Sequence, residues 1–219
     1  MGALVFFGGM IFGCFMNVVI KKISYIVYNK MNTEKYIDNK DYKKTKNHIN
    51  FSIKNILIVL LSGILFLISF LQLGLNVIFI KALVLNSILI VVSFIDIEHE
   101  IIPDKIIIFM LVVGALFSFI DDISLLNAVG GMVFGGGLML ILALVPGVLG
   151  GGDIKLMFAL GIFLGFKGAL SALLFAFILA SVISILLLLL KIKKRKDYIP
   201  FGPFLSVGSF IAFHFANIM

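Results

Sequence analysis

Cysteine is almost absent from this chain: Cys14 is the only one among 219 residues. One cysteine cannot form a disulfide within the chain, and it excludes the structural zinc sites that are built from two or more cysteines. We therefore expect a fold without covalent cross-links, with no zinc and no other metal site.

Charged residues are scarce as well. They make up 13% of the chain, whereas 62% of the residues are hydrophobic. A soluble domain is about a quarter charged and about half apolar, and at this length it could not bury so much apolar surface. The composition indicates one compact membrane domain without a separate soluble enzyme module. The formal net charge of +7 is concentrated in loops beside apolar segments, which favours contact with anionic lipids over binding to nucleic acid.

Eight apolar segments are long enough, or nearly so, to cross the hydrocarbon core of a membrane. We therefore predict an all-α, polytopic membrane helix bundle of about eight transmembrane segments. The fourth and the sixth are short for a full crossing, and glycine or proline near their ends favours tilted or partly re-entrant helices. The predicted segments cover residues 3–20, 55–72, 77–95, 106–120, 128–148, 154–166, 168–190 and 199–217.

The distribution of lysine and arginine predicts how the bundle is oriented. Residues 21–54 contain nine lysines, and residues 191–198 contain five basic residues. With eight crossings both loops fall on one side of the membrane, which is cytoplasmic by the positive-inside rule. Lys105 and Lys155 then lie on the same side, so that sixteen of the eighteen basic residues are cytoplasmic. Both termini are predicted to lie outside.

Two aspartates stand apart from the other acidic residues. Glu34, Asp38, Asp41 and Asp197 lie among lysines in the predicted cytoplasmic loops, and capping of the next helix explains Asp121 and Asp122. Ionisable groups at the edge of a membrane are costly unless they are hydrated, paired or neutralised, so each is a functional hypothesis. The glycines before the second aspartate would let a substrate backbone or a helix approach closely. The proline after the first would break any helix that continued from it. The two stretches are Asp96-Ile97-Glu98-His99-Glu100-Ile101-Ile102-Pro103-Asp104 and Gly150-Gly151-Gly152-Asp153-Ile154-Lys155.

The predicted topology brings Asp96 and Asp153 to the same cytoplasmic interface, although 57 residues separate them. Two facing carboxyl groups at a low-dielectric boundary cannot both ionise cheaply, so one is protonated and the other charged near neutral pH. Such a pair can activate water against a peptide carbonyl, as in aspartic proteases. From the residues alone, helix capping and ion binding remain alternatives for each aspartate. Glu98, Glu100 and Asp104 are assigned to the interface, or to attraction of a basic substrate segment.

At these residues the sequence resembles the prepilin peptidases, membrane-embedded aspartic proteases with a GxGD motif. The stretch Gly150-Gly151-Gly152-Asp153-Ile154-Lys155 is similar to the family's GxGDxK motif, and Asp96 with Pro103-Asp104 is similar to the motif of the other catalytic aspartate. Two further stretches look like family features: the N-terminal Gly13-Cys14-Phe15-Met16-Asn17-Val18-Val19-Ile20, which resembles a GSFLNVV-type segment, and Pro200-Phe201-Gly202-Pro203-Phe204. Together these ordered motifs span nearly the whole chain.

The resemblance implies removal of the short basic leader from type IV prepilins or pseudopilins at the cytoplasmic face of the bacterial inner membrane. It implies no cofactor for proteolysis, whereas family members often also methylate the new N-terminus with S-adenosylmethionine. It divides the chain into an N-terminal region, 1–72, with the basic loop 21–54, and a peptidase core of six helices, 73–219. It implies that Asp96 and Asp153 are catalytic, and that the motif residues near the substrate are Gly150, Gly152, Lys155, Pro103 and Asp104.

The chain departs from the family in one respect. Many bifunctional members carry two Cys-x-x-Cys pairs in the first cytoplasmic loop, a spacing suited to zinc. Residues 21–54 contain no cysteine, which excludes that zinc site and leaves methylation open.

Two other classes of function remain open. A transporter could use Asp96 and Asp153 as proton or cation sites. It would place the carboxyl groups near the middle of the membrane and show an internal repeat, and the sequence has no evident repeat. A non-enzymatic scaffold of pilus assembly is a third alternative, and it predicts that Asp153→Asn is tolerated.

Small and polar residues inside the apolar segments predict how the helices pack. Gly9-xxx-Gly13 and Gly131-xxx-Gly135 have the spacing that allows close approach of membrane helices, and we assign both to packing within the chain. Asn17 is predicted to hydrogen-bond across to a neighbouring helix, and so is Asn86.

Overall fold

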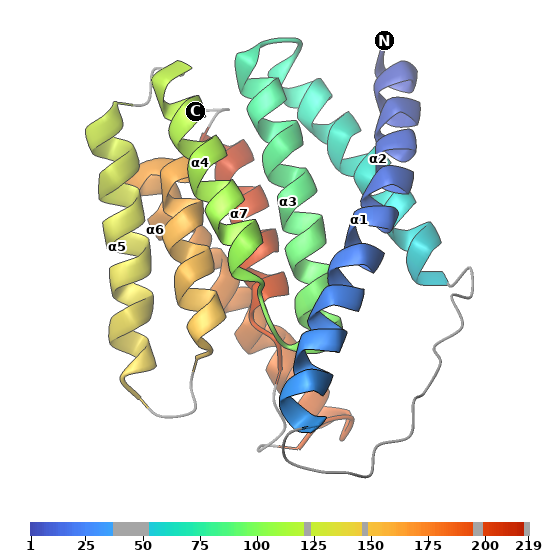
Figure 1. Cartoon of the computed structure of the whole chain (residues 1–219). Coiled ribbons are helices and arrows are strands. Elements are labelled where there is room, and N and C mark those ends of the chain that lie inside the picture. Colours follow the sequence, from blue (N-terminus) through green and yellow to red (C-terminus); the bar gives the residue numbers. More distant parts are fainter. Residues whose placement is uncertain (37–52, 121–123, 146–148, 195–198, 217–219) are drawn as a thin grey trace.

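The computed structural model describes residues 1–36, 53–120, 124–145, 149–194 and 199–216. All regular secondary structure in these ranges is α-helical, which confirms the all-α prediction (Figure 1). Five of the helices are long and apolar enough to cross a membrane, namely α1 (over Gly2–Asn29), α2, α3, α5 and α6. The protein is therefore a multi-pass membrane protein. The helices are α1 (Gly2–Tyr36), α2 (Ile53–Leu73), α3 (Val77–His99), α4 (Asp104–Ile120), α5 (Leu125–Ala143), α6 (Gly151–Leu189) and α7 (Gly202–Ala216).

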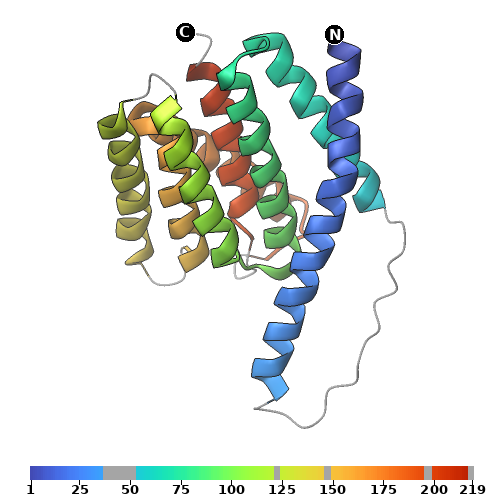
Figure 2. The same ribbon diagram turned by 45° about the horizontal axis from the view of Figure 1, so that its top comes forward.

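Helix α6 contains a sharp break at Gly165, where the backbone has φ 68° and ψ −178°. Only glycine adopts this conformation without strain. The break frees the amide of Phe166, which donates a hydrogen bond to Oδ1 of Asn127 in α5 over 2.9 Å. The two arms of α6 correspond to the predicted segments 154–166 and 168–190. Figures 1 and 2 show the second arm returning obliquely toward the end of the bundle where the first arm began.

Helix α1 is longer than the sequence predicted. A loop was expected from residue 21, but the helix continues to Tyr36. Residues 21–36 contain neither glycine nor proline, so nothing in them ends a helix. Figure 2 shows this part of α1 extending beyond the other helices. The rest of the predicted loop, residues 37–52, lies outside the described residues, as does the part of loop 191–198 that follows residue 194.

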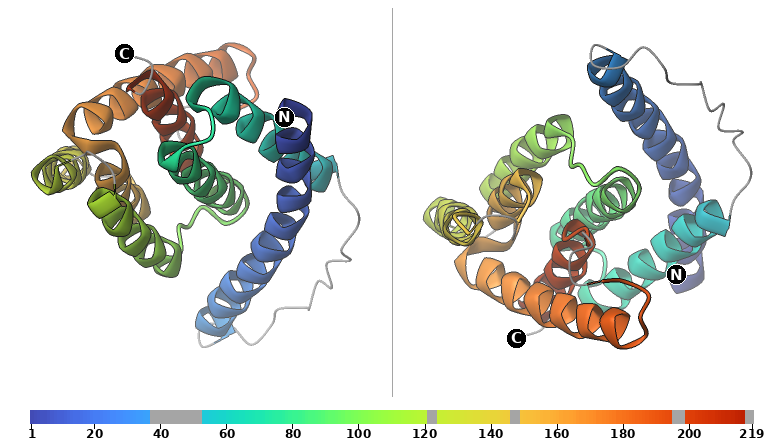
Figure 3. Two further views of the ribbon diagram at one scale, coloured as in Figure 1. Left: turned by 90° about the horizontal axis from the view of Figure 1, so that it is seen from above. Right: turned by 90° about the horizontal axis from the view of Figure 1, so that it is seen from below.

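Helix α3 forms the centre of the bundle. Figure 3 shows α3 and α7 surrounded by the other helices, and α3 is the most buried of the membrane-spanning helices. Apolar side chains of α3, α6 and α7 form the core, with Leu85, Ile95, Phe163 and Leu205 fully buried. This position makes α3 a fixed support for the residues at its C-terminal end.

The predicted close approach of helices through small residues is confirmed within the chain. In α1, a Cβ on Gly9 would lie 3.0 Å from Cα of Gly63 in α2. Oγ of Ser62 donates a hydrogen bond to the carbonyl of Gly9 over 2.9 Å. In α5, a Cβ on Gly131 would overlap the backbone of α6 at Gly165. The first two helices, and likewise α5 and α6, therefore pack backbone against backbone.

The two predicted asparagine contacts are also confirmed. Nδ2 of Asn17 in α1 donates a hydrogen bond to the carbonyl of Asn55 in α2 over 3.0 Å. Nδ2 of Asn86 in α3 donates to Oγ of Ser69 in α2 over 2.9 Å. Each amide thus joins its helix to a neighbour in a region without water.

Candidate functional site: two aspartates at one end of the bundle

Asp96 lies in the last turn of α3. The helix ends because Glu100 takes the left-handed conformation, at φ 55° and ψ 31°, and its N–H bonds to the carbonyl of Asp96 over 2.8 Å. The side chain of Asp96 is 3% exposed. Its Oδ2 accepts a hydrogen bond from the backbone N–H of Gly202, the first residue of α7, over 2.9 Å. Two helices that are distant in the sequence therefore hold this carboxyl group.

Asp153 lies in the first turn of α6. Its side chain is also 3% exposed, and its Oδ2 accepts the N–H of Gly150 over 3.3 Å. The N–H of Asp153 bonds in turn to the carbonyl of Gly150 over 3.2 Å. A carboxylate at this position is stabilised by the exposed N–H groups and the dipole of the helix N-terminus.

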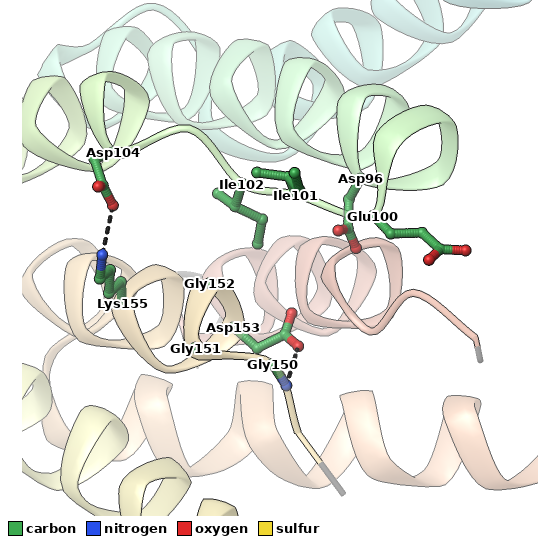
Figure 4. A pocket seen from close by; sticks show the side chains of 10 residues that line it. All are labelled: Asp96, Glu100, Ile101, Ile102, Asp104, Gly150, Gly151, Gly152, Asp153 and Lys155. Atoms are coloured by element: carbon green, nitrogen blue, oxygen red, sulfur yellow. Dashed lines mark hydrogen bonds and ion pairs between the residues drawn. The ribbon is translucent and has the colours of Figure 1, made fainter. Parts of the chain in front are cut away.

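The two aspartates share one cavity of about 340 Å³. Figure 4 shows their carboxyl groups pointing toward one another across it. Asp96 comes from the end of α3 and Asp153 from the start of α6, as the predicted topology required. The cavity is lined by Asp96, Glu100, Ile101, Ile102, Asp104, Gly150, Gly151, Gly152, Asp153 and Lys155.

Gly152 allows α6 to approach the segment between α3 and α4. A Cβ at this position would lie 3.3 Å from Cβ of Ile102, whose side chain is 6% exposed. Ile102 therefore forms an apolar wall of the cavity beside the two aspartates (Figure 4). The sequence analysis missed this residue, since one isoleucine among many apolar residues carries no signal.

Pro103 has a structural place beside the cavity and is not part of its lining. The helix of Asp96 ends at His99 and does not continue through Pro103. The carbonyl of Pro103 accepts the N–H of Ile106 over 3.0 Å and so begins α4. Pro103 thereby sets the position of Asp104 at the start of that helix.

Asp104 and Lys155 form an ion pair at the rim of the cavity. Nζ of Lys155 lies 2.7 Å from Oδ1 of Asp104, and the two side chains are 57% and 66% exposed. The pair joins α4 to α6 and brings together two motif residues from separate stretches of the sequence. Among the cavity-lining residues, Lys155 is the one with a basic side chain.

We expect Lys155→Ala to change the thermal unfolding midpoint by less than about 3 °C, because a solvent-exposed ion pair contributes at most about 1 kcal/mol. Asp104→Asn should give the same small change, since it removes the same pair. Thermal unfolding in detergent measures both. A loss of many degrees in either variant would show that the pair supports the fold.

Glu98 and His99 lie outside the cavity. Oε2 of Glu98 contacts Nζ of Lys54 in α2 at 2.5 Å and accepts a hydrogen bond from Oγ of Ser24 in α1 over 3.2 Å. Glu98 therefore joins α1 and the start of α2 to the end of α3. His99 is the last residue of α3, and its side chain is only 14% exposed.

Gly202 is the other functional residue that the sequence analysis did not assign. The stretch Pro200-Phe201-Gly202-Pro203-Phe204 was noted for its resemblance, but no role was derived from it. Its contact with Asp96 spans 106 residues. That distance explains why no local pattern revealed it.

The arrangement supplies what acid–base chemistry requires. Two carboxyl groups, both buried and facing each other, can divide the roles of proton donor and proton acceptor. Backbone N–H groups fix one oxygen of each. Within the described residues there is no group of three or more histidine, cysteine, aspartate or glutamate side chains that could hold a metal ion.

Comparison with known proteins finds similarity to one family in the region of the two aspartates. A family model described as "Type IV leader peptidase family" matches residues 83–185, a range that contains Asp96 and Asp153. The chain is similar to proteins named prepilin leader peptidase/N-methyltransferase in three bacteria. The identities are 31% over 163 residues for Bacillus subtilis, 30% over 174 for Xanthomonas campestris and 32% over 169 for Neisseria gonorrhoeae.

These alignments cover 72%, 76% and 74% of this chain and 64%, 60% and 58% of the respective relatives. The chain thus spans less than two thirds of the length of the relatives it matches. No solved structure matches the chain.

Proposed function

Because the model of the type IV leader peptidase family matches residues 83–185, we propose that the protein belongs to this family and is a membrane-embedded aspartic endopeptidase. Its substrate is a type IV prepilin or pseudopilin, from which it removes the short basic leader. The observation that carries the proposal is the pair of buried aspartates, Asp96 and Asp153, facing each other across one cavity.

The two carboxyl groups divide the work of hydrolysis. The ionised one takes a proton from a water molecule, whose oxygen attacks the scissile peptide carbonyl. The protonated one donates its proton to the carbonyl oxygen, giving a tetrahedral intermediate. Proton transfer to the peptide nitrogen then allows the C–N bond to break, and the pair returns to its starting state.

The other motif residues shape the approach of the substrate. Gly150 lines the cavity beside Asp153, where an extended substrate backbone would lie, and Gly152 brings the apolar wall of Ile102 close to that path. The ion pair of Asp104 and Lys155 lies at the rim, where a polar leader would enter. Pro103 fixes the turn that carries Asp104.

The proposed topology has eight membrane segments, the two arms of α6 counting as two, with both termini outside and the cavity at the cytoplasmic face of the bacterial inner membrane. The positions of two lysines support this arrangement. Lys54 of α2 pairs with Glu98, two residues after Asp96, and Lys155 lines the cavity itself. Both lysines lie at the end of the bundle that holds the aspartates, which favours the cytoplasmic side and contact with anionic lipids.

Methylation of the new N-terminus is proposed as a second activity. Its support is the name of the relatives, which includes N-methyltransferase. The methyl donor would be S-adenosylmethionine. Among the described residues we assign no binding site for it, because the cavity presents mainly carboxyl groups, glycines and isoleucines.

The transporter alternative is not supported. It would place the carboxyl groups near the middle of the membrane, whereas Asp96 lies in the last turn of α3 and Asp153 in the first turn of α6. The names of the matched relatives are those of peptidases.

Purified protein in detergent, mixed with a prepilin from the same cell, is expected to shorten that prepilin by its leader. Mass spectrometry before and after incubation measures the loss, and inclusion of S-adenosylmethionine tests for an added ~14 Da on the mature chain. Cleavage without the mass gain would leave the peptidase and remove the methyltransferase. A matched prepilin that stays intact would refute the proposal.

A further inference from the structure

We propose that Gly202 is the positioning residue of Asp96: its backbone N–H holds the carboxyl group at the cavity, and its missing side chain leaves the space that this group occupies. The inference rests on the proposed function only where it concerns catalysis. Its geometric part concerns the fold alone and can be tested without a substrate.

The contact between the two residues is direct. The N–H of Gly202 donates to Oδ2 of Asp96 over 2.9 Å, and both residues are buried. The first N–H groups of a helix have no partner within the helix. This bond therefore satisfies the amide at the start of α7 and the carboxyl group at the end of α3 at the same time. Hydrogen bonds to an ionised acceptor are stronger than those between neutral groups.

A side chain at position 202 would displace the carboxyl group. A Cβ there would lie 2.6 Å from Oδ2 of Asp96 and 3.0 Å from its Cγ. Both distances are shorter than the usual 3.5–4.0 Å between non-bonded carbon atoms. The direction of a Cβ is set by the backbone, so the new methyl group at position 202 cannot itself rotate out of the contact. Either Asp96 turns away from the cavity or α7 moves away from α3.

The far end of α7 is also fixed, which limits the second of these responses. Nε2 of His214 lies 2.9 Å from Oγ of Ser69 in α2, and Nδ2 of Asn86 in α3 donates to the same hydroxyl over 2.9 Å. His214 and Ser69 are 4% and 0% exposed. The helix has 15 residues, and its middle is fixed as well, because Gly208 packs on α6. A Cβ on Gly208 would lie 2.5 Å from the carbonyl oxygen of Ala172. The helix therefore has little room to move, and displacement of Asp96 is the expected result.

The bond also determines which oxygen of Asp96 reacts. Oδ2 is held by Gly202, whereas Oδ1 accepts no hydrogen bond from any residue that the structure describes. Asp153 shows the same pattern, since its Oδ2 accepts the N–H of Gly150. Each aspartate thus has one oxygen fixed by a glycine amide and another available to water or substrate. Reactive groups must be held within about 0.5 Å of the productive geometry, which such a backbone contact provides.

The geometric part is tested by a double-mutant cycle in thermal unfolding. We expect Gly202→Ala to lower the unfolding midpoint by roughly 5 °C in the wild-type background, and by less than about 2 °C in an Asp96→Ala background, because the crowded carboxyl group is then gone. Gly208→Ala is the matched control: its clash is with α6, so its loss should be the same in both backgrounds. If Gly202→Ala lowered the unfolding midpoint equally in both backgrounds, the inference would be overturned.

A second measurement does not depend on how well Gly202→Ala folds. In protein labelled with ¹⁵N-glycine, the amide proton of Gly202 should resonate downfield in the wild type and move upfield in Asp96→Ala, while that of Gly208 stays in place. No movement of the Gly202 signal would refute the contact.

The catalytic part is tested with the prepilin assay. Gly202→Ala should lower kcat by roughly 100-fold with KM within about threefold, since a misplacement of about 1 Å costs a rate of that order. If Gly202→Ala showed the expected coupling to Asp96→Ala in thermal unfolding but had an unchanged kcat, the catalytic part of the inference would be overturned. If even the wild type cleaved no prepilin, the proposed function would fail while the unfolding cycle and the amide signal would still decide the geometry.

Discussion

Asp153→Asn is expected to lower the rate of leader cleavage by at least about 1,000-fold while the protein stays folded. The amide has nearly the shape of the carboxyl group, and its oxygen can still accept the N–H of Gly150. It can neither take a proton from water nor share one with Asp96. Loss of a group that moves a proton in the reaction costs on the order of 10³–10⁶ in kcat. Asp96→Asn should have an effect of the same size.

The double variant gives a sharper result than either single one. Because the two groups act as a unit, removing both should cost about as much as removing one, and the effects should not multiply. Initial rates on a purified prepilin, with the folded fraction checked by thermal unfolding, measure all three variants. Independent, multiplying effects would mean that the aspartates do not work as a pair.

Glu98→Gln is the control for these variants. Glu98 lies two residues from Asp96, on the same last turn of α3, and is acidic, yet its partners are Lys54 and Ser24 outside the cavity. The Glu98→Gln variant should cleave the prepilin at a rate within a few-fold of the wild-type rate. If Asp153→Asn cleaved as fast as this control, the scaffold alternative would gain support and the proposed peptidase would lose its central observation.

The sequence predicted the two aspartates for a physical reason. In a chain with so few charges, a carboxyl group beside an apolar segment must have a partner or a function. The loop acids lie among lysines, and Asp121 and Asp122 can cap the next helix, which leaves Asp96 and Asp153 as the candidates. The number and direction of the apolar segments then brought both to one end of the bundle. This inference needed no knowledge of the packing, and the shared cavity agrees with it.

Contacts between distant segments escaped the sequence analysis. The N–H of Gly202 reaches Asp96 across 106 residues. Ile102 lines the cavity beside the aspartates, where Gly152 lets α6 approach it. Neither contact has a period or a spacing that a single sequence displays. The length of α1 was not predicted for a different reason. Residues 21–36 are polar enough in composition to resemble a loop, but they contain no glycine or proline to end the helix.

Gly161→Ala is expected to be the most destabilising single methyl addition in α6. Gly161 faces the backbone of α5, and a Cβ there would overlap the carbonyl group of Gly131. Backbone atoms cannot move aside as a flexible side chain can, so the two helices must separate. Overpacking of this kind costs about 3 kcal/mol, which corresponds to a fall of roughly 6–12 °C in the unfolding midpoint for a chain of this size.

The matched control is Gly130→Ala, one residue before Gly131 on the same α5 helix. A Cβ at Gly130 would meet no atom within 4 Å. Alanine is a better helix former than glycine by up to about 1 kcal/mol, so this variant should be as stable as the wild type or slightly more so. Thermal unfolding in detergent compares the two. Equal stability of Gly161→Ala and Gly130→Ala would show that α5 and α6 do not approach backbone to backbone. The first arm of α6, which carries Asp153, would then be held in place by some other contact.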